Sequence, residues 1–237
     1  MISVVTPSVR KEALEITRKC LQNQTFKDFE WLIGSPFDPE IIEAKWVVDD
    51  FKGGVWTFNR INNKLLKEAK GDIIVTIQDN IWFAPDTLAR FKFWQDYLGP
   101  NWAVTGSGNI YSKLDEIGKP FVLCWEDPRR SSISREGSAY EVNPEDWEAN
   151  FASAPKKMFE DIGGWDEKLD FTGFGMDQVS IVDRADIAGY RFWIDHNLEC
   201  KGLKHERNKD WDKKHNMHGV YAKRRQEYLK TPVLNYL

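Results

Sequence analysis

The sequence has few cysteines, no long apolar run and little excess charge, and each shortage excludes a class of protein. Its three cysteines, Cys20, Cys124 and Cys200, are far apart and odd in number, so they predict neither a zinc cluster nor a disulfide framework. No window approaches the ~18 apolar residues of a membrane span, and the apolar N-terminal stretch is too short for a signal peptide. We therefore expect a cytoplasmic protein that is at most peripherally associated with a membrane.

The balance of charge argues against a polyanionic partner. Lysines and arginines number 33 against 37 aspartates and glutamates, which gives a formal net charge of -4. A protein of this charge has no general attraction for phosphate backbones, so we expect no nucleic-acid partner. With 41% hydrophobic and 30% charged residues, the 237-residue chain has the composition of an ordered protein with a buried core. We predict a single folded domain over residues 1–237.

Strand-like and helix-like segments alternate along the chain. Residues 72–77, which read DIIVTI, are nearly all apolar and β-branched, as in a parallel strand covered on both faces. The region 109–150 is irregular and predicts an inserted hairpin or loop. Apolar spacing and Gly or Pro punctuation predict further strands at 1–6, 30–34, 46–48, 102–106 and 190–194, and helices at 10–24, 58–69, 86–98, 155–162 and 179–188. This alternation predicts an α/β fold with a doubly wound sheet.

Two of the predicted strand ends carry polar residues suited to binding. Ligands of open α/β sheets lie at the carboxyl ends of strands, where loops and helix N-termini meet. The first end, residues 6–10 (TPSVR), offers loop amides and a guanidinium to a nucleotide phosphate, or it simply caps the helix that follows. The second end, residues 78–80 (QDN), offers oxygen ligands suited to Mg²⁺ or Mn²⁺, or it is an ordinary turn.

Longer runs of the sequence follow the order of known motifs. Residues 59–80 read NRINNKLLKEAKGDIIVTIQDN. This run resembles the pattern of glycosyltransferase family two, in which an Asn, a helix ending Ala-x-Gly-Asp and an apolar strand lead to a DxD-type metal motif. Residues 154–167 (APKKMFEDIGGWDE) and 173–178 (GFGMDQ), followed by Arg184 and Gly189, are similar to motifs of galactosyltransferase-like members of that superfamily.

The resemblance implies a GT-A-type α/β domain with a mixed, mostly parallel sheet and helices on both faces. It implies a nucleotide-binding half at 1–108, an acceptor-binding half with an inserted loop at 109–207 and a C-terminal tail at 208–237. The implied activity is inverting transfer of a hexose from a UDP- or GDP-linked donor to an acceptor hydroxyl, with Mn²⁺ or Mg²⁺ as the cofactor. The acceptor is left open between a glycan, a lipid-linked molecule and a protein.

The resemblance also assigns roles to individual residues. Asp177 follows a Gly-x-Gly turn and precedes a helix, so we expect it to be the base that deprotonates the acceptor hydroxyl, or else a helix cap. The expected metal ligands are Asp79 and His205, with a surface position, or His215 and His218, as alternatives for the histidine. The expected donor-binding residues are Thr6, Pro7, Ser8, Arg10, Asp38, Arg60, Asn63, Gln78 and Asp79. The expected sugar- and acceptor-binding residues are Trp165, which is equally suited to a core, Asp166 and Glu167.

Three neutral residues depart from the family pattern. Gln78 and Asn80 stand where the usual metal motif has acids, and Gln178 stands where a second acid follows Asp177. Amides coordinate hard cations less strongly than carboxylates do. These departures keep open a second hypothesis, a catalytically silent nucleotide- or sugar-binding protein with the same fold. A sugar-nucleotide pyrophosphorylase would need a Gly-rich, basic loop, which residues 6–10 do not supply.

Overall fold

The computed structural model describes residues 1–50, 57–115, 118–170, 176–205 and 217–237. Its strands are β1 (Ile2–Pro7), β2 (Phe29–Ser35), β3 (Ala44–Val48), β4 (Ile73–Ile77), β5 (Ile81–Phe83), β6 (Trp102–Tyr111), β7 (Leu123–Trp125), β8 (Ala139–Val142), β9 (Phe151–Pro155) and β10 (Arg191–Leu203). Its α-helices are α1 (Leu14–Gln22), α2 (Phe58–Glu68), α3 (Thr87–Leu98), α4 (Ile133–Glu136), α5 (Lys156–Asp161), α6 (Asp177–Ile187) and α7 (Met217–Tyr228).

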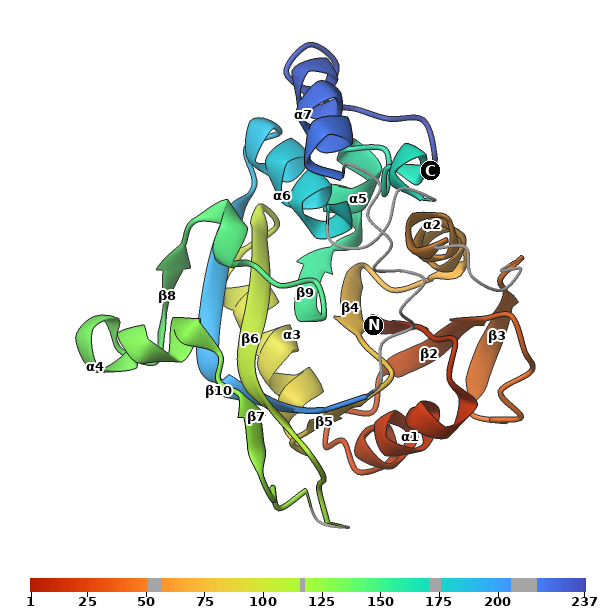
Figure 1. Ribbon diagram of the computed structural model, residues 1–237, viewed down its shortest axis with the longest axis vertical. Coiled ribbons are helices and arrows are strands. Elements are labelled where there is room, and N and C mark those ends of the chain that lie inside the picture. Colours follow the sequence, from red (N-terminus) through yellow and green to blue (C-terminus); the bar gives the residue numbers. More distant parts are fainter. Residues whose placement is uncertain (51–56, 116–117, 171–175, 206–216) are drawn as a thin grey trace.

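The strands form one mixed sheet with the order β3-β2-β1-β4-β9-β6-β10-β5 (Figure 1). The first four strands in this order are parallel neighbours, and β6 and β10 are parallel to each other. Strands β9 and β5 run antiparallel to their neighbours, while β7 and β8 pair outside the main order. The predicted α/β class and mostly parallel sheet are therefore confirmed.

Helices cover both faces of the sheet. Successive strand residues point to opposite sides, so apolar side chains of the strands are buried on both faces. On one face, Leu65 of α2, Phe159 of α5 and Ile181 of α6 share a buried cluster with strand residues. On the other face, Leu14 of α1 and Phe91 of α3 do the same. All five residues of β4 are buried, as expected of a central strand whose side chains are apolar and β-branched.

Strand β9 lies between β4 and β6, and it joins the two parallel parts of the sheet. Phe151 is paired with Ile77 of β4, and Ala152 with Thr105 of β6. The sequence predicted no strand here, because the segment FASAP is rich in small residues and lacks β-branched ones. The antiparallel direction of β9 places the residues that precede it at the carboxyl end of β4, next to the predicted ligand edge.

The region 109–150 does contain a hairpin, in which β7 pairs with the end of β6. The strand predicted at 190–194 continues to Leu203 and pairs with β6, β8 and β5. No helix in the described part of the chain is long and apolar enough to cross a membrane.

The C-terminal residues are packed against the body of the protein. The amide of Leu234 donates a 3.0 Å hydrogen bond to the carbonyl of Ile162, and the amide of Tyr236 donates one of 3.1 Å to Gly163. Gly163 has a positive φ of 70°, and a Cβ there would come within 1.5 Å of the Leu234 carbonyl oxygen. Only glycine therefore fits this contact.

Candidate functional site

The carboxyl ends of β1 and β4 meet at one edge of the sheet, since the two strands are parallel neighbours. Ser8 donates a 2.7 Å hydrogen bond to Oδ2 of Asp79. Arg10 forms an ion pair with Oδ1 of the same carboxylate and also donates from Nε to Oδ2 at 3.3 Å. Asp79 is 3% exposed. The two polar strand ends identified in the sequence therefore form one cluster.

This cluster does not fit a divalent metal ion in its present arrangement. Both oxygens of Asp79 bind Arg10, whose positive charge would repel a cation. Nδ2 of Asn80 lies 2.9 Å from Nδ1 of His205 and donates to the carbonyl of Leu203. Across the described ranges, no group of three or more His, Cys, Asp or Glu residues could hold a metal. An ion at Asp79 would require the carboxylate to separate from Arg10.

The N-termini of α2 and α6 are connected by hydrogen bonds. Nδ2 of Asn59 donates to Asp177 at 3.4 Å and to Asp170 at 2.9 Å. Asp177 is the first residue of α6 and is 5% exposed, whereas Met176 occupies the N-cap position. The helix N-terminus stabilises a negative charge at this position. The arrangement is compatible with the predicted role of Asp177 as a base.

Asp170 caps α2 from a distant part of the chain. Its carboxylate accepts hydrogen bonds from the amides of Asn59 and Arg60, at 2.9 and 3.0 Å. Burial raises the pKa of Asp170 to about 6, and these hydrogen bonds offset only part of that rise. The capping interaction fixes the start of α2 beside Asp177.

Gln178, the residue after Asp177, connects α6 to the segment that precedes β9. Its Nε2 donates to the carbonyl of Trp147, and its Oε1 accepts from the amide of Ala149, both at 2.9 Å. One residue further, Asn150 accepts a 2.7 Å hydrogen bond from Nε2 of Gln78. These contacts bring α6, the β9 approach and the end of β4 to the same edge of the sheet.

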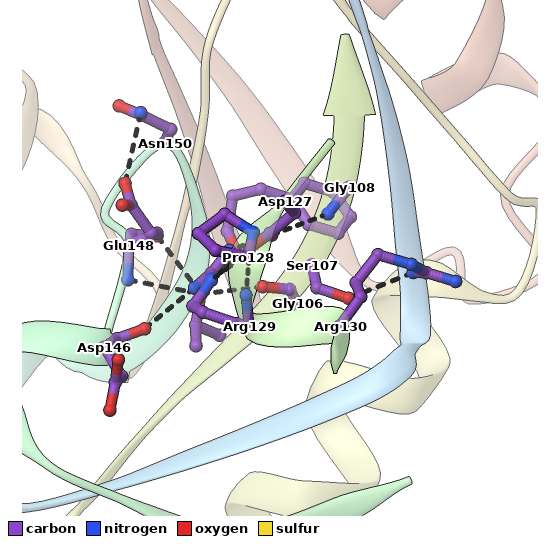
Figure 2. A network of polar contacts seen from close by, with 12 residues as sticks. Gly106, Ser107, Gly108, Asp127, Pro128, Arg129, Arg130, Asp146, Glu148 and Asn150 are labelled. Atoms are coloured by element: carbon purple, nitrogen blue, oxygen red, sulfur yellow. Dashed lines mark hydrogen bonds and ion pairs between the residues drawn. The ribbon is translucent and has the colours of Figure 1, made fainter. Parts of the chain in front are cut away.

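A buried polar network supports this segment from the side of β6 (Figure 2). Arg129 forms an ion pair with Asp127 and donates a 2.8 Å hydrogen bond to the carbonyl of Asp146. Burial raises the pKa of Asp127, but Arg129 more than offsets this effect and holds the pKa below its ordinary value. Asp127 also accepts from the amide of Gly108 in β6. The network therefore ties the irregular region to the central sheet.

Sequence reasoning missed two carboxylates at the same edge, one buried and one half-buried. Asp49 follows β3, is 6% exposed and accepts hydrogen bonds of 3.1 and 3.3 Å from Thr57, and burial raises its pKa. Glu148 precedes β9, and Figure 2 shows its carboxylate directed toward Asn150. The position of Asp49 at a strand end could have been recognised, but that of Glu148 depends on a strand the sequence did not predict.

Several residues predicted to bind the donor or the sugar make contacts within the protein. Asn63 bonds both the amide and the carbonyl of Trp165, at 2.7 and 2.9 Å, and donates to Glu167. Trp165 is 1% exposed and packs edge-on against Phe58, as a core residue does. Asp166 is fully buried and pairs with Arg224 of α7. Neither Trp165 nor Asp166 presents a free surface to a sugar in this structure, while Glu167 remains half-buried.

The remaining donor-site predictions are spread along the strand ends. Thr6 is fully buried and its hydroxyl accepts a 3.0 Å hydrogen bond from Trp31. Pro7 ends β1 beside the Ser8 cluster, and half-buried Arg60 lies in the first turn of α2. Asp38 is exposed and caps a turn by accepting from the amide of Glu40. The structure thus places Ser8, Arg10 and Asp79 in direct contact but leaves Asp38 outside their contacts.

The parallel strands, the inserted antiparallel strand β9 and the polar carboxyl edge define a protein of the GT-A fold. The particular structures to which it is similar are those of TarS 1–349 from S. aureus. In complex with UDP-GlcNAc, TarS matches 99% of this chain with a TM-score of 0.68 and 14% identity, over 68% of its own chain. In complex with UDP, it matches 86% of this chain with a TM-score of 0.63 and 14% identity, over 60% of its own chain.

The chain therefore spans only 60% to 68% of the length of these TarS chains. At 14% identity the similarity establishes the fold alone. No protein-family model and no curated protein sequence matches the chain.

Proposed function

We propose that this chain is a glycosyltransferase that uses a nucleotide-sugar donor. The observation that carries the proposal is the grouping of Arg10, Asp79 and Asp177 around one edge of a GT-A sheet. Similarity to structures that contain UDP and UDP-GlcNAc supports a nucleotide sugar as the donor. A UDP-linked donor is preferred over a GDP-linked one for the same reason.

The proposed reaction is a direct displacement with inversion. The acceptor hydroxyl loses its proton to Asp177 as its oxygen attacks the anomeric carbon, and the bond from that carbon to the diphosphate oxygen breaks. Arg10 can stabilise the negative charge on the leaving diphosphate, because its side chain is 26% exposed at the strand edge. The position of Asp177 at a helix N-terminus favours a negative charge on its side chain. A glycan, a lipid-linked molecule or a protein remains the proposed acceptor.

A silent binding protein of the same fold is the second candidate. Three neutral amides, Gln78, Asn80 and Gln178, stand at motif positions, and Asp79 is paired with Arg10. Such a protein would bind the nucleotide but would not cleave the donor. Dependence on Mn²⁺ or Mg²⁺ stays a prediction, and it requires Asp79 to separate from Arg10 when the ion binds.

Calorimetric titration of UDP and GDP, with and without Mn²⁺, tests the proposed donor site. We expect UDP to bind the wild-type protein. Asp79→Ala should raise the affinity for UDP by about tenfold in the absence of Mn²⁺, because the change releases Arg10 from its carboxylate. Asp96→Ala, a change at an exposed carboxylate of α3 that pairs with Lys92, is the matched control. If neither nucleotide binds the wild-type protein, the proposed function is wrong.

A further inference from the structure

Glu148 is a half-buried carboxylate that neither the fold nor the proposed reaction uses. It lies on the segment that enters β9, two residues before Asn150. Because β9 begins opposite the last residue of β4, Ile77, this segment reaches the carboxyl edge of β4. Glu148 is therefore placed at the ligand edge although the irregular region around it showed no motif.

Two amide side chains define the position of Glu148 more closely. On one side, Gln78 binds Asn150, whose Nδ2 donates to Oε2 of Glu148 at 3.4 Å. On the other side, Gln178 holds the backbone of Trp147 and Ala149, the two residues that flank Glu148. The carboxylate thus lies between the end of β4, which carries Asp79, and the start of α6, which carries Asp177.

The surroundings of Glu148 leave its carboxylate able to accept a ligand. The hydrogen bond from Asn150 is long, and a carboxylate offers about four lone-pair sites. Burial raises the pKa of Glu148, while the charge of Arg129 and a hydrogen bond from Gln178 partly offset that rise. Arg129 is largely committed to Asp127 and the carbonyl of Asp146, so it does not neutralise Glu148 by a direct ion pair in this structure.

The geometry of group transfer indicates what this carboxylate would meet. The transferred sugar must lie between the leaving diphosphate, near Arg10 and Asp79, and the base that receives the acceptor proton, Asp177. Glu148 borders that space from the β9 side. We infer that Glu148 binds a hydroxyl group of the donor sugar, and that it supplies the second acid that the motif at Asp177 lacks where Gln178 stands.

This inference rests on the proposed function, and its test compares UDP with UDP-GlcNAc as calorimetric ligands. A charge-assisted hydrogen bond to the sugar should be absent with UDP and present with UDP-GlcNAc. We expect Glu148→Gln to weaken UDP-GlcNAc binding by tenfold or more and to change UDP binding less than twofold. Glu148→Asp, which keeps the charge but shortens the side chain, should give an intermediate loss and serves if Glu148→Gln folds poorly.

The matched control is Asp146→Asn, which changes a neighbouring carboxylate whose pKa is also raised by burial. Arg129 donates its hydrogen bond to the backbone carbonyl of Asp146, so the substitution leaves that contact in place. It should leave the affinities for both ligands unchanged. The inference is overturned if the ratio of UDP-GlcNAc affinity to UDP affinity is unchanged in both Glu148 variants. If both affinities fall by the same factor, the role of Glu148 is structural. Failure of the wild-type protein to bind UDP instead overturns the proposed function, and the inference with it.

Discussion

At the scale of single residues, Asp177 and Asp79 have different surroundings at the ligand edge. Asp79 is bound by Arg10 and Ser8, whereas Asp177 accepts a long hydrogen bond from Asn59. The sequence motif treats both as site residues of equal standing. The structure gives them different chemistry, since the first is half of an ion pair and the second lies at a helix N-terminus.

Asp177→Asn should separate binding from catalysis. The amide has nearly the shape of the carboxylate but cannot take a proton from the acceptor hydroxyl, so turnover of the donor should fall by 10² to 10⁴-fold, on the order typical of a general base. UDP affinity should stay within about twofold of wild type. Release of UDP from UDP-GlcNAc measures turnover, and calorimetry measures binding. Turnover that persists in the variant would remove Asp177 from the role of base.

Contacts among the candidate site residues were easiest to predict where a strand end carries them. Ser8, Arg10 and Asp79 were all identified from the sequence, and parallel pairing brings them together. The contacts of Asn63 and Asp166 could not be predicted, because their partners are distant in the chain, at positions 165 and 224. A polar side chain in a motif can form hydrogen bonds with the backbone of a buried turn or with a ligand. Only the tertiary contacts distinguish these two roles.

At the scale of elements, the start of α2 depends on a carboxylate from outside the helix. Thr57 makes no side-chain cap, and Asp170 accepts from the amides of Asn59 and Arg60 instead. The length of α2 was predicted correctly to within one residue, because apolar spacing defines it. It could not show the cap, which lies more than a hundred residues further along the chain.

This cap should make stability depend on pH. The pKa of Asp170 is about 6 in the folded protein against 3.8 for the free side chain, so the folded state binds the proton more tightly. Its contribution to the free energy of unfolding is therefore greatest below about pH 4 and declines as pH rises to about 6, by up to roughly 3 kcal/mol. Asp170→Asn carries no titrating group and should lack this decline.

Urea unfolding of wild type and Asp170→Asn at several values between pH 4 and 7 measures the difference. The variant can be less stable at every pH, because an amide NH₂ faces the amide of Arg60. The test is whether the difference in free energy of unfolding between wild type and variant changes with pH. A constant difference across this range would show that Asp170 does not have a raised pKa.

At the scale of the whole molecule, a buried ion pair attaches α7 to the body. Asp166 is fully buried and binds Arg224 through Nε at 2.7 Å and Nη2 at 2.6 Å. Tyr228 of α7 donates to the same carboxylate. The C-terminal segment therefore belongs to the folded unit, although its sequence showed no clear apolar pattern before about residue 221.

Arg224→Ala should destabilise the protein by about 3 kcal/mol, because it leaves the carboxylate of Asp166 buried without its cation. The adjacent Arg225→Ala is the matched control, since Arg225 is 55% exposed and solvent screens its pair with Asp183. Urea unfolding measures both. Equal effects of the two variants would show that the buried pair does not hold the segment in place.

The position of β9 has a consequence for the order in which the chain can fold. The strands β1, β2, β3 and β4 are complete once residue 77 has been made, and β6 once residue 111 has, but the sheet becomes continuous only when residues 151–155 pair with β4 and β6. Until then β4 has an unpaired edge. Contacts between β4 and β9 span more than seventy residues, so their loop-closure entropy should slow this step. We therefore expect the β9 side of the ligand edge to form late in folding, because Asn150 reaches Gln78 only after β9 has been inserted.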